Sequence, residues 1–158
     1  MTRRVGRGHN VEMSTTSVEP FRSLLASRNL GVVATIKPNG RPHLSNVSYI
    51  YDSGKDLIRI SVTGGRAKVR NLRRDPRVSF HVATQAGWSY AVVEGIAELS
   101  PVASEPDDAV VEELIDIFRL IQGEHPDWDE YRAAMVADRR LVLRIAIEHA
   151  YGLPERSS

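Results

Sequence analysis

The stretch Leu30-Gly-Val-Val-Ala-Thr-Ile36, followed by Lys37-Pro-Asn-Gly40, predicts a β-hairpin. Its first part is a run of apolar and β-branched residues, which is typical of a buried strand. In its second part, proline fixes φ and the Asn-Gly pair supplies positions that tolerate positive φ, as a tight turn requires. From Arg41 to Tyr51 the side chains alternate with a period of two, so we expect the second strand of the hairpin there.

The same periodicities extend outward from this hairpin along the chain. Period-two or β-branched patterns predict four further strands, over residues 57–62, 78–83, 90–99 and 141–147. Helical spacing of apolar residues, with proline and acidic residues near helix starts, predicts helices over residues 20–27, 66–74, 107–123 and 128–137. Six short strands with inserted helices favour an antiparallel barrel over a doubly wound parallel sheet. Periodicity alone does not distinguish a barrel from a sandwich.

The domain boundaries follow from composition. The 158 residues are enough for one domain with its own core. Residues 1–18 are basic and then rich in serine and threonine, with hardly any large apolar side chain, so we expect them to form a disordered leader. Residues 19–154 are expected to form the barrel domain, and residues 155–158 a polar tail.

Composition also excludes several classes of protein. The chain has no cysteine, which rules out disulfides and thiol catalysis, and its formal net charge of +1 gives no global attraction to nucleic acid or anionic membranes. It shows no signal-peptide pattern and no apolar run of about 20 residues, so we expect a cytoplasmic protein that does not enter a membrane. The five histidines lack metal-site spacing, so no metal is expected.

The segment from Thr63 to Arg77 carries the strongest functional signal. Its two glycines allow close approach of the backbone to a ligand, and the helix that follows presents unpaired N–H groups at its start. Arg66 adds a planar fork of donors and Lys68 a compact positive charge, with Asn71 one turn further on. This combination predicts a phosphate site. A solvated, basic helix face without a ligand fits the same residues, and the segment contains neither a Walker motif nor a dinucleotide-binding motif.

Two other positions are of interest. Trp88 and Tyr90 place large aromatic rings at a strand start, where they serve either as core or dimer-interface anchors or as the wall of a site for a flat heterocycle. His43, in the strand that begins at Arg41-Pro42, is a weak candidate for a catalytic residue because it is placed to reach a cleft.

The order of these motifs resembles the pyridoxamine 5′-phosphate oxidase-like split-barrel superfamily, and within it the actinobacterial flavin/deazaflavin oxidoreductases that use coenzyme F420. The similarity runs from Leu30 to Tyr151 and lies in residues 31–36, 40–47, 66–77, 87–90 and 149–153. It implies a mainly β, α+β fold: a six-stranded antiparallel split β-barrel with peripheral helices. It also implies a homodimer with two equivalent cofactor clefts at the subunit interface.

The resemblance assigns roles to individual residues. It implies that the phosphate and side chain of the cofactor are bound by Ser61, Arg66, Ala67, Lys68 and Asn71. It implies that the ring system is lined by Pro42, His43, Ser45 and Asn46, and that Trp88 completes the cleft across the dimer. The surplus cations Arg70, Arg73 and Arg74 are candidates for contact with the acidic oligoglutamate tail of F420.

The function implied is that of an F420-dependent oxidoreductase, which transfers a hydride between the deazaflavin and a small conjugated or heteroaromatic organic substrate. An FMN-dependent oxidoreductase of the same fold remains an alternative, because the Arg-x-Lys-x-x-Asn core at Arg66 is shared with FMN-binding relatives. A non-catalytic F420 carrier is a third reading. Nucleic-acid binding through the basic helix ranks last, since the chain is nearly neutral and only 6% aromatic.

Overall fold

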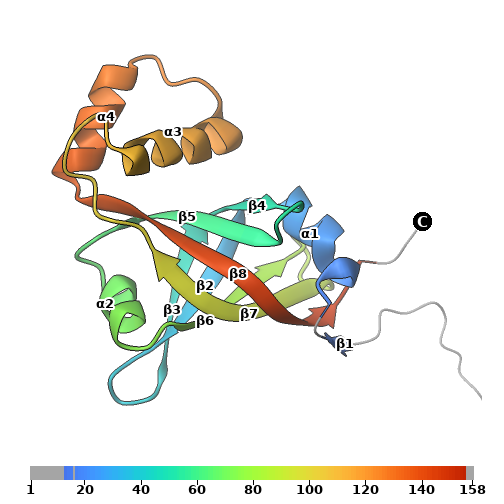
Figure 1. Ribbon diagram of the computed structural model, residues 1–158. Coiled ribbons are helices and arrows are strands. Elements are labelled where there is room, and N and C mark those ends of the chain that lie inside the picture. The colour runs from blue at the N-terminus through green and yellow to red at the C-terminus, as the bar shows by residue number, and fades with distance from the viewer. Residues whose placement is uncertain (1–12, 16, 156–158) are drawn as a thin grey trace, which may run out of the picture.

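The computed structural model describes residues 13–15 and 17–155, which form one curled antiparallel sheet with helices around it (Figure 1). The hydrogen-bonded order of seven strands is β3-β2-β6-β7-β8-β5-β4, and an eighth strand, β1, pairs with β8. The strands are β1 (Met13–Thr15), β2 (Leu30–Ile36), β3 (Pro42–Ser48), β4 (Ile50–Asp52), β5 (Leu57–Thr63), β6 (Arg77–Ala83), β7 (Tyr90–Leu99) and β8 (Arg140–Leu153). The helices are η1 (Glu19–Phe21), α1 (Arg22–Ser27), α2 (Ala67–Arg74), α3 (Ala109–Gln122) and α4 (Trp128–Ala137).

The sheet curls because its two edge strands are neighbours in the chain. β3 ends one edge and β4 the other, and only Tyr49 lies between them. Tyr49 is fully buried, its N–H donates to the Asn29 carbonyl at 3.0 Å, and its hydroxyl donates to the Leu25 carbonyl at 2.6 Å. The edges therefore meet, and β3 contacts β5 without pairing to it, which is the geometry of a split barrel.

The predicted six-strand count is too low, and the reason lies in this crossing. The alternating pattern over residues 41–51 predicted one strand, whereas the chain leaves β2 at Ser48 and joins β5 from Ile50 onward. The pattern continues through Tyr49 because the partly buried residues of β3 alternate with exposed ones as far as Ser48 and Tyr49 itself is buried, so the switch of partner leaves no break in periodicity. β1, inside the leader, adds the other unpredicted strand.

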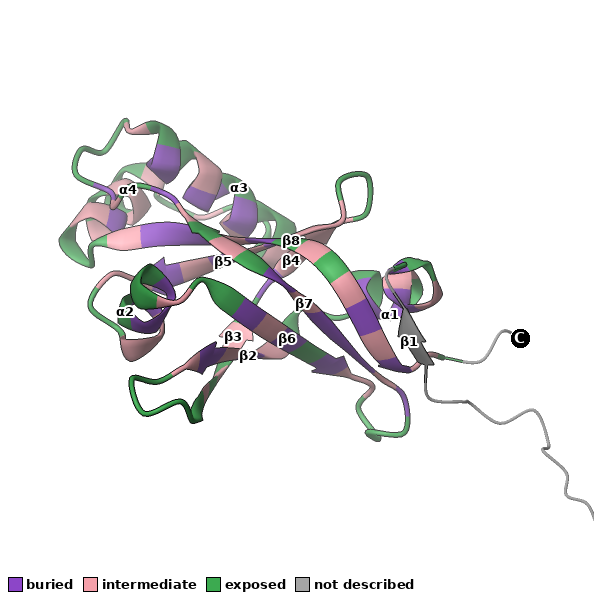
Figure 2. Cartoon of the chain, turned by 60° about the horizontal axis from the view of Figure 1, so that its bottom comes forward, coloured by how far each residue is buried: buried purple, intermediate pink, exposed green. Residues whose placement is uncertain are grey.

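The barrel interior is closed at one end by the first helix. Phe21, Leu24 and Leu25 are buried, and α1 contacts β4, β6 and β7. Inside the barrel, the rings of Tyr49 and Phe80 meet edge to face with centroids 4.9 Å apart. Along β6, buried and exposed residues alternate, as expected for a sheet with one face in the core (Figure 2).

α3 and α4 form a helical layer over β8 and β5 (Figure 1). Their buried residues form a second apolar cluster with Val142 of β8, separate from the barrel core. Both helices match the predicted spans closely, α4 at both ends. None of the helices that the structure describes is long and apolar enough to cross a membrane.

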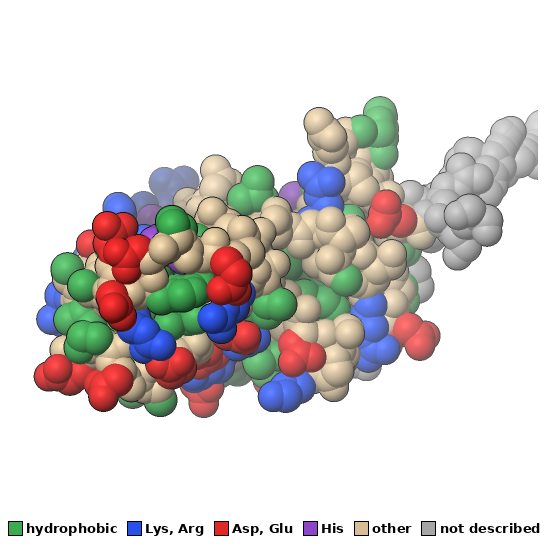
Figure 3. All heavy atoms as spheres, turned by 90° about the horizontal axis from the view of Figure 1, so that it is seen from above, with side chains coloured by type: hydrophobic (Ala, Val, Ile, Leu, Met, Phe, Trp, Pro, Cys, Tyr) green, Lys and Arg blue, Asp and Glu red, His purple; other side chains and the backbone are tan. Residues whose placement is uncertain are grey.

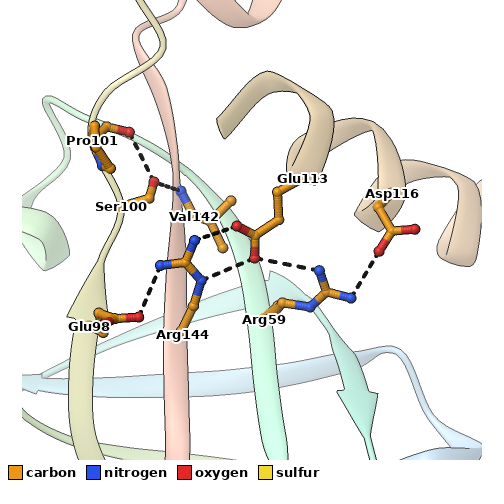
Figure 4. A network of polar contacts seen from close by, with 8 residues as sticks. All are labelled: Arg59, Glu98, Ser100, Pro101, Glu113, Asp116, Val142 and Arg144. Atoms are coloured by element: carbon orange, nitrogen blue, oxygen red, sulfur yellow. Dashed lines mark hydrogen bonds and ion pairs between the residues drawn. The ribbon is translucent and has the colours of Figure 1, made fainter. Parts of the chain in front are cut away.

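An ion-pair network holds α3 against the sheet (Figure 4). Arg59 of β5 and Arg144 of β8 are directly opposite each other in the strand register, an arrangement that is destabilising for like charges alone. Glu113 of α3 resolves it: one carboxylate oxygen accepts from Arg144 Nε at 3.1 Å and from Arg59 at 3.4 Å. Asp116 and Glu98 complete the network at 3.0 Å each.

The leader is ordered over part of its predicted span. Met13–Thr15 pairs with Ala150–Gly152 of β8, and Val18 is buried, so the folded domain begins before the predicted boundary at residue 19. The predicted disorder of residues 1–12 and the tail residues 156–158 lies outside the described residues.

Candidate functional site

A cleft of about 630 Å³ opens at the seam of the barrel, where β3 and β5 approach without pairing. Its floor and sides come from both strands, from the start of α2 and of β8, and from the facing side of α3 and α4. The lining residues are Asn46, Val47, Ser48, Ser61, Val62, Thr63, Arg66, Lys68, Ile117, Phe118, Ile121, Gln122, Tyr131, Met135 and Arg140.

Three cations, Arg66, Lys68 and Arg140, meet in this cleft. Arg66 is the residue at the N-terminal cap of α2, and Lys68 lies in its first turn, so the positive end of the helix adds to their charge. The pKa of Lys68 is lowered, first by burial and then by repulsion from Arg66 and Arg140. Within the part of the chain that the structure describes, no carboxylate pairs with any of the three. The cleft is therefore poised to receive an anion.

The opposite wall of the cleft is apolar and aromatic. Ile117, Phe118 and Ile121 come from successive turns of α3, while Tyr131 and Met135 come from α4. The two helices contact each other at the centre of the wall, where the centroids of the Phe118 and Tyr131 rings lie 5.0 Å apart and the Tyr131 hydroxyl donates to the Leu114 carbonyl at 3.1 Å. Such a surface suits the flat body of a heterocyclic ligand.

Four of the predicted cofactor residues lie in this cleft: Asn46, Ser61, Arg66 and Lys68. They come from β3, β5 and the start of α2, so the fold brings together side chains that are up to 22 positions apart in the sequence. Ala67, between the two cations, is partly buried in the first turn of α2 and does not line the cleft.

Asn71 lies on the other side of α2. It is 5% exposed, its side-chain amide donates to the Thr35 hydroxyl at 3.0 Å, and its carbonyl oxygen accepts from Arg74 at 3.2 Å. These bonds fasten α2 to β2. Asn71 is therefore not among the residues that line the cleft of this chain.

The residues predicted around the ring system are divided between the two faces of β3. Pro42 is exposed on the outer face, together with Asn46, whereas His43 and Ser45 point to the inner face. His43 Nδ1 and Ser45 Oγ are buried and make no hydrogen bond to the described residues. Neither Pro42, His43 nor Ser45 lines the cleft of the single chain.

Trp88 is 81% exposed in the turn between β6 and β7, away from the cleft of its own chain. The surplus cations also lie elsewhere: Arg70 donates to the Gly65 carbonyl and Arg74 to the Ile36 carbonyl, and Arg73 is exposed on α2. None of these three arginines is a lining residue.

A comparison with protein families decides what kind of chain this is. Residues 18–153 match the family model described as pyridoxamine 5′-phosphate oxidase. The chain belongs to the pyridoxamine 5′-phosphate oxidase family. The predicted resemblance is thereby confirmed over nearly the whole of the described structure.

The chain is also similar to individual proteins over most of its length. It is 23% identical over 142 residues to an F420H(2)-dependent biliverdin reductase of Mycobacterium tuberculosis, covering 90% of this chain and 92% of that protein. A solved structure named an F420 reductase matches at 25% identity and a TM-score of 0.62, over 82% of this chain and 94% of the other. A conserved hypothetical protein of Mycobacterium tuberculosis matches at 25% identity and a TM-score of 0.66, over 96% and 90%.

The residues of this family member fit a phosphate-bearing flavin or deazaflavin. Cations without a carboxylate partner among the described residues stand at one end of the cleft and an apolar wall at its side, and the buried Nε of the lining residue Arg140 makes no hydrogen bond to the described residues. Buried polar groups are ordinarily satisfied, so such an atom indicates a position where a ligand or partner supplies the missing bond.

The sequence pointed to neither Arg140 nor the helical wall. Arg140 follows a helix and begins a strand, and only the pairing of β8 with β5 brings it opposite Thr63 and beside the predicted cations. The wall residues were recognised as the apolar side of two helices, a pattern that does not distinguish side chains in a core from side chains that face a ligand.

Proposed function

We propose that this protein is an F420-dependent oxidoreductase that transfers a hydride between the deazaflavin and a small conjugated or heteroaromatic organic substrate. The observation that carries the proposal is the cleft in which unpaired Arg66 and Lys68 face the apolar wall of α3 and α4. The similarity to relatives that are named as F420-dependent reductases supports the choice of cofactor. We place the activity in the cytoplasm.

In this proposal, the residues of the cleft bind the cofactor and orient it. Arg66 and Lys68 hold the phosphate with charge-assisted hydrogen bonds, aided by the N-terminus of α2. Ser61 and Asn46 add polar contacts from β5 and β3, and the α3–α4 wall excludes water from the ring. A deazaflavin, when bound, supplies the hydride chemistry. Among the residues that the structure describes, no acidic side chain and no histidine lines the cleft, so we assign the accompanying proton to solvent.

The proposal includes a homodimer. Leu30 of β2 and Leu44 of β3 are 65% and 63% exposed, and Ile96 of β7 is 46% exposed, all on the outer face of the sheet. The α3–α4 layer contacts β4, β5 and β8 instead. A second copy seated on this face would cover these apolar side chains and bring its Trp88 and Pro42 toward the site.

The test is a fluorescence titration of the purified protein with F420 and, side by side, with FMN. Tighter binding of F420 supports the proposal. Tighter binding of FMN favours the alternative, an FMN-dependent oxidoreductase of the same fold. The double variant Arg66→Ala/Lys68→Ala is expected to raise the F420 dissociation constant at least tenfold, or about 1.4 kcal/mol.

Arg73→Ala is the matched control, because it removes a cation from the same helix outside the cleft. An unchanged dissociation constant in the folded double variant contradicts the assignment of the phosphate site. If the protein binds F420 tightly but reduces no acceptor in a substrate screen, it is an F420 carrier and not an enzyme.

A further inference from the structure

Arg140 occupies a position that no local pattern in the sequence explains. It is the first residue of β8, and in the strand register it lies opposite Thr63 of β5. Arg140 projects from the same face of β8 as Val142 and Arg144, since side chains two residues apart in a strand share a face. That face lies beneath α3 and α4, as the burial of Val142 in their cluster shows.

The two arginines on this face of β8, Arg140 and Arg144, differ in their carboxylate partners. Arg144 is neutralised by Glu113 of α3 and by Glu98 of β7 (Figure 4). Arg140 has no carboxylate partner among the described residues, and its own hydrogen bonds go to Ser61, from Nη1 to Oγ at 3.3 Å and to the carbonyl oxygen at 3.5 Å. Both are long bonds to neutral acceptors, which compensate a partly buried guanidinium poorly.

One donor of Arg140 is not satisfied at all. Its Nε is buried and has no hydrogen-bond partner in the described part of the chain. A guanidinium in which Nε and a terminal nitrogen are free to act together binds a carboxylate or phosphate through two parallel bonds. The unsatisfied donor therefore points to an anionic partner for Arg140 on this side of the cleft.

The charge of Arg140 affects the pKa values of groups on both walls of the cleft. It is one of the causes that lower the pKa of Lys68 on α2, and it opposes the burial that raises the pKa of Tyr131 on α4. Arg140 therefore stands on the floor between the cationic end and the helical wall. The helical end of the molecule otherwise shows acidic and basic side chains interspersed, so the unbalanced charge is local to the cleft (Figure 3).

We propose that Arg140 is a third anion-binding residue of this cleft, which binds an acidic group of the ligand together with Arg66 and Lys68. The inference rests on the proposed function for the identity of the ligand, but not for the existence of the anion site. The acidic group is either the phosphate itself or a carboxylate of the oligoglutamate tail. The other candidates for the tail, Arg70, Arg73 and Arg74 of α2, do not line the cleft.

The experiment compares the wild type with Arg140→Gln, which removes the charge and keeps an N–H donor on a shorter stem, and with Arg140→Lys, which keeps the charge. Arg139→Gln is the control, since it removes the same charge from the adjacent, exposed residue. Each protein is titrated by calorimetry with inorganic pyrophosphate, and by fluorescence with F420 that carries its glutamates and with F420 from which they have been removed.

Arg140→Gln is expected to weaken pyrophosphate binding and binding of tailed F420 at least tenfold, with partial recovery in Arg140→Lys and no change in Arg139→Gln. An equal loss for both forms of F420 assigns Arg140 to the phosphate, and a loss confined to the tailed form assigns it to a carboxylate. Unchanged binding of all three ligands in folded Arg140→Gln overturns the proposal. If the wild type binds pyrophosphate but not F420, the proposed function fails while the anion site is still tested.

Discussion

At the scale of one residue, the partly buried charge of Lys68 in the proposed binding site lowers the stability of the folded protein. Its pKa is lowered in the folded protein by burial and by Arg66 and Arg140, so the protonated form is disfavoured by folding. Below the lowered pKa the charge of Lys68 therefore destabilises the native state. This cost falls as the pH rises through the lowered pKa and Lys68 becomes neutral.

We therefore expect Lys68→Met, which keeps the stem of the side chain, to be more stable than the wild type at pH 7 and to lose this advantage in alkaline solution. Urea unfolding at pH 7 and near pH 10 measures the difference. Lys55→Met, in an exposed turn, is the control and is expected to change stability little at either pH. A less stable Lys68→Met protein at pH 7 would show that the lysine is paired in the folded chain.

Two roles of Asn71 can be tested against each other. The family resemblance implies a cofactor ligand, whereas the hydrogen bonds of Asn71 connect α2 to Thr35 of β2. Because the amide is buried, Asn71→Ala is expected to lower the free energy of unfolding by about 1–3 kcal/mol. Thermal unfolding and F420 titration of the same samples check this. Weaker binding without loss of stability would favour the ligand role.

At the scale of elements, α3 is positioned by Glu113 and then presents Ile117 and Phe118 to the cleft. Removing the carboxylate leaves Arg59 and Arg144 opposed across the strand pair without compensation. Glu113→Gln is therefore expected to cost about 2–4 kcal/mol of stability and to weaken ligand binding through displacement of the wall. Urea unfolding and titration measure the two effects.

Glu112→Gln serves as the matched control on the same helix. Glu112 is paired with Arg132 on the exposed side of α3, where ion pairs contribute less than about 1 kcal/mol. Equal destabilisation by the two variants would show that the Glu113 network does not position the helix.

Most helices and strands could be predicted from the sequence because the periodicity that identifies each of them lies within the element itself. β2, β7 and α4 match their predicted spans, since alternation or helical spacing in each is bounded by turn or capping residues. The crossing at Tyr49 could not be predicted in this way, because it depends on which strand each half finds as a partner. Of the site, sequence reasoning located the α2 cations through their glycine and charge pattern, whereas Arg140 needs the β5–β8 register to become their neighbour.

At the scale of the whole molecule, the outer face of β2 and β3 is part of the proposed dimer interface. Leu44 on this face and Leu120 on α3 are each 63% exposed, so they form a matched pair. A charge at the centre of an interface is costly, so Leu44→Asp is expected to convert the proposed dimer to monomer while Leu120→Asp leaves it intact. Light scattering coupled to gel filtration measures the mass, and a monomeric wild type would contradict the proposal.

The single-residue link at Tyr49 also constrains how a ligand enters and leaves. The two strand edges beside the cleft cannot separate without pulling Tyr49 from its buried position and breaking its bonds to Asn29 and Leu25. We therefore expect the mouth to widen by displacement of the α3–α4 layer, whose attachment is made of side chains and not of strand ladders. We expect the rate of ligand exchange to depend on the firmness of that attachment, so that loosening the helices speeds release while the barrel beneath them stays closed.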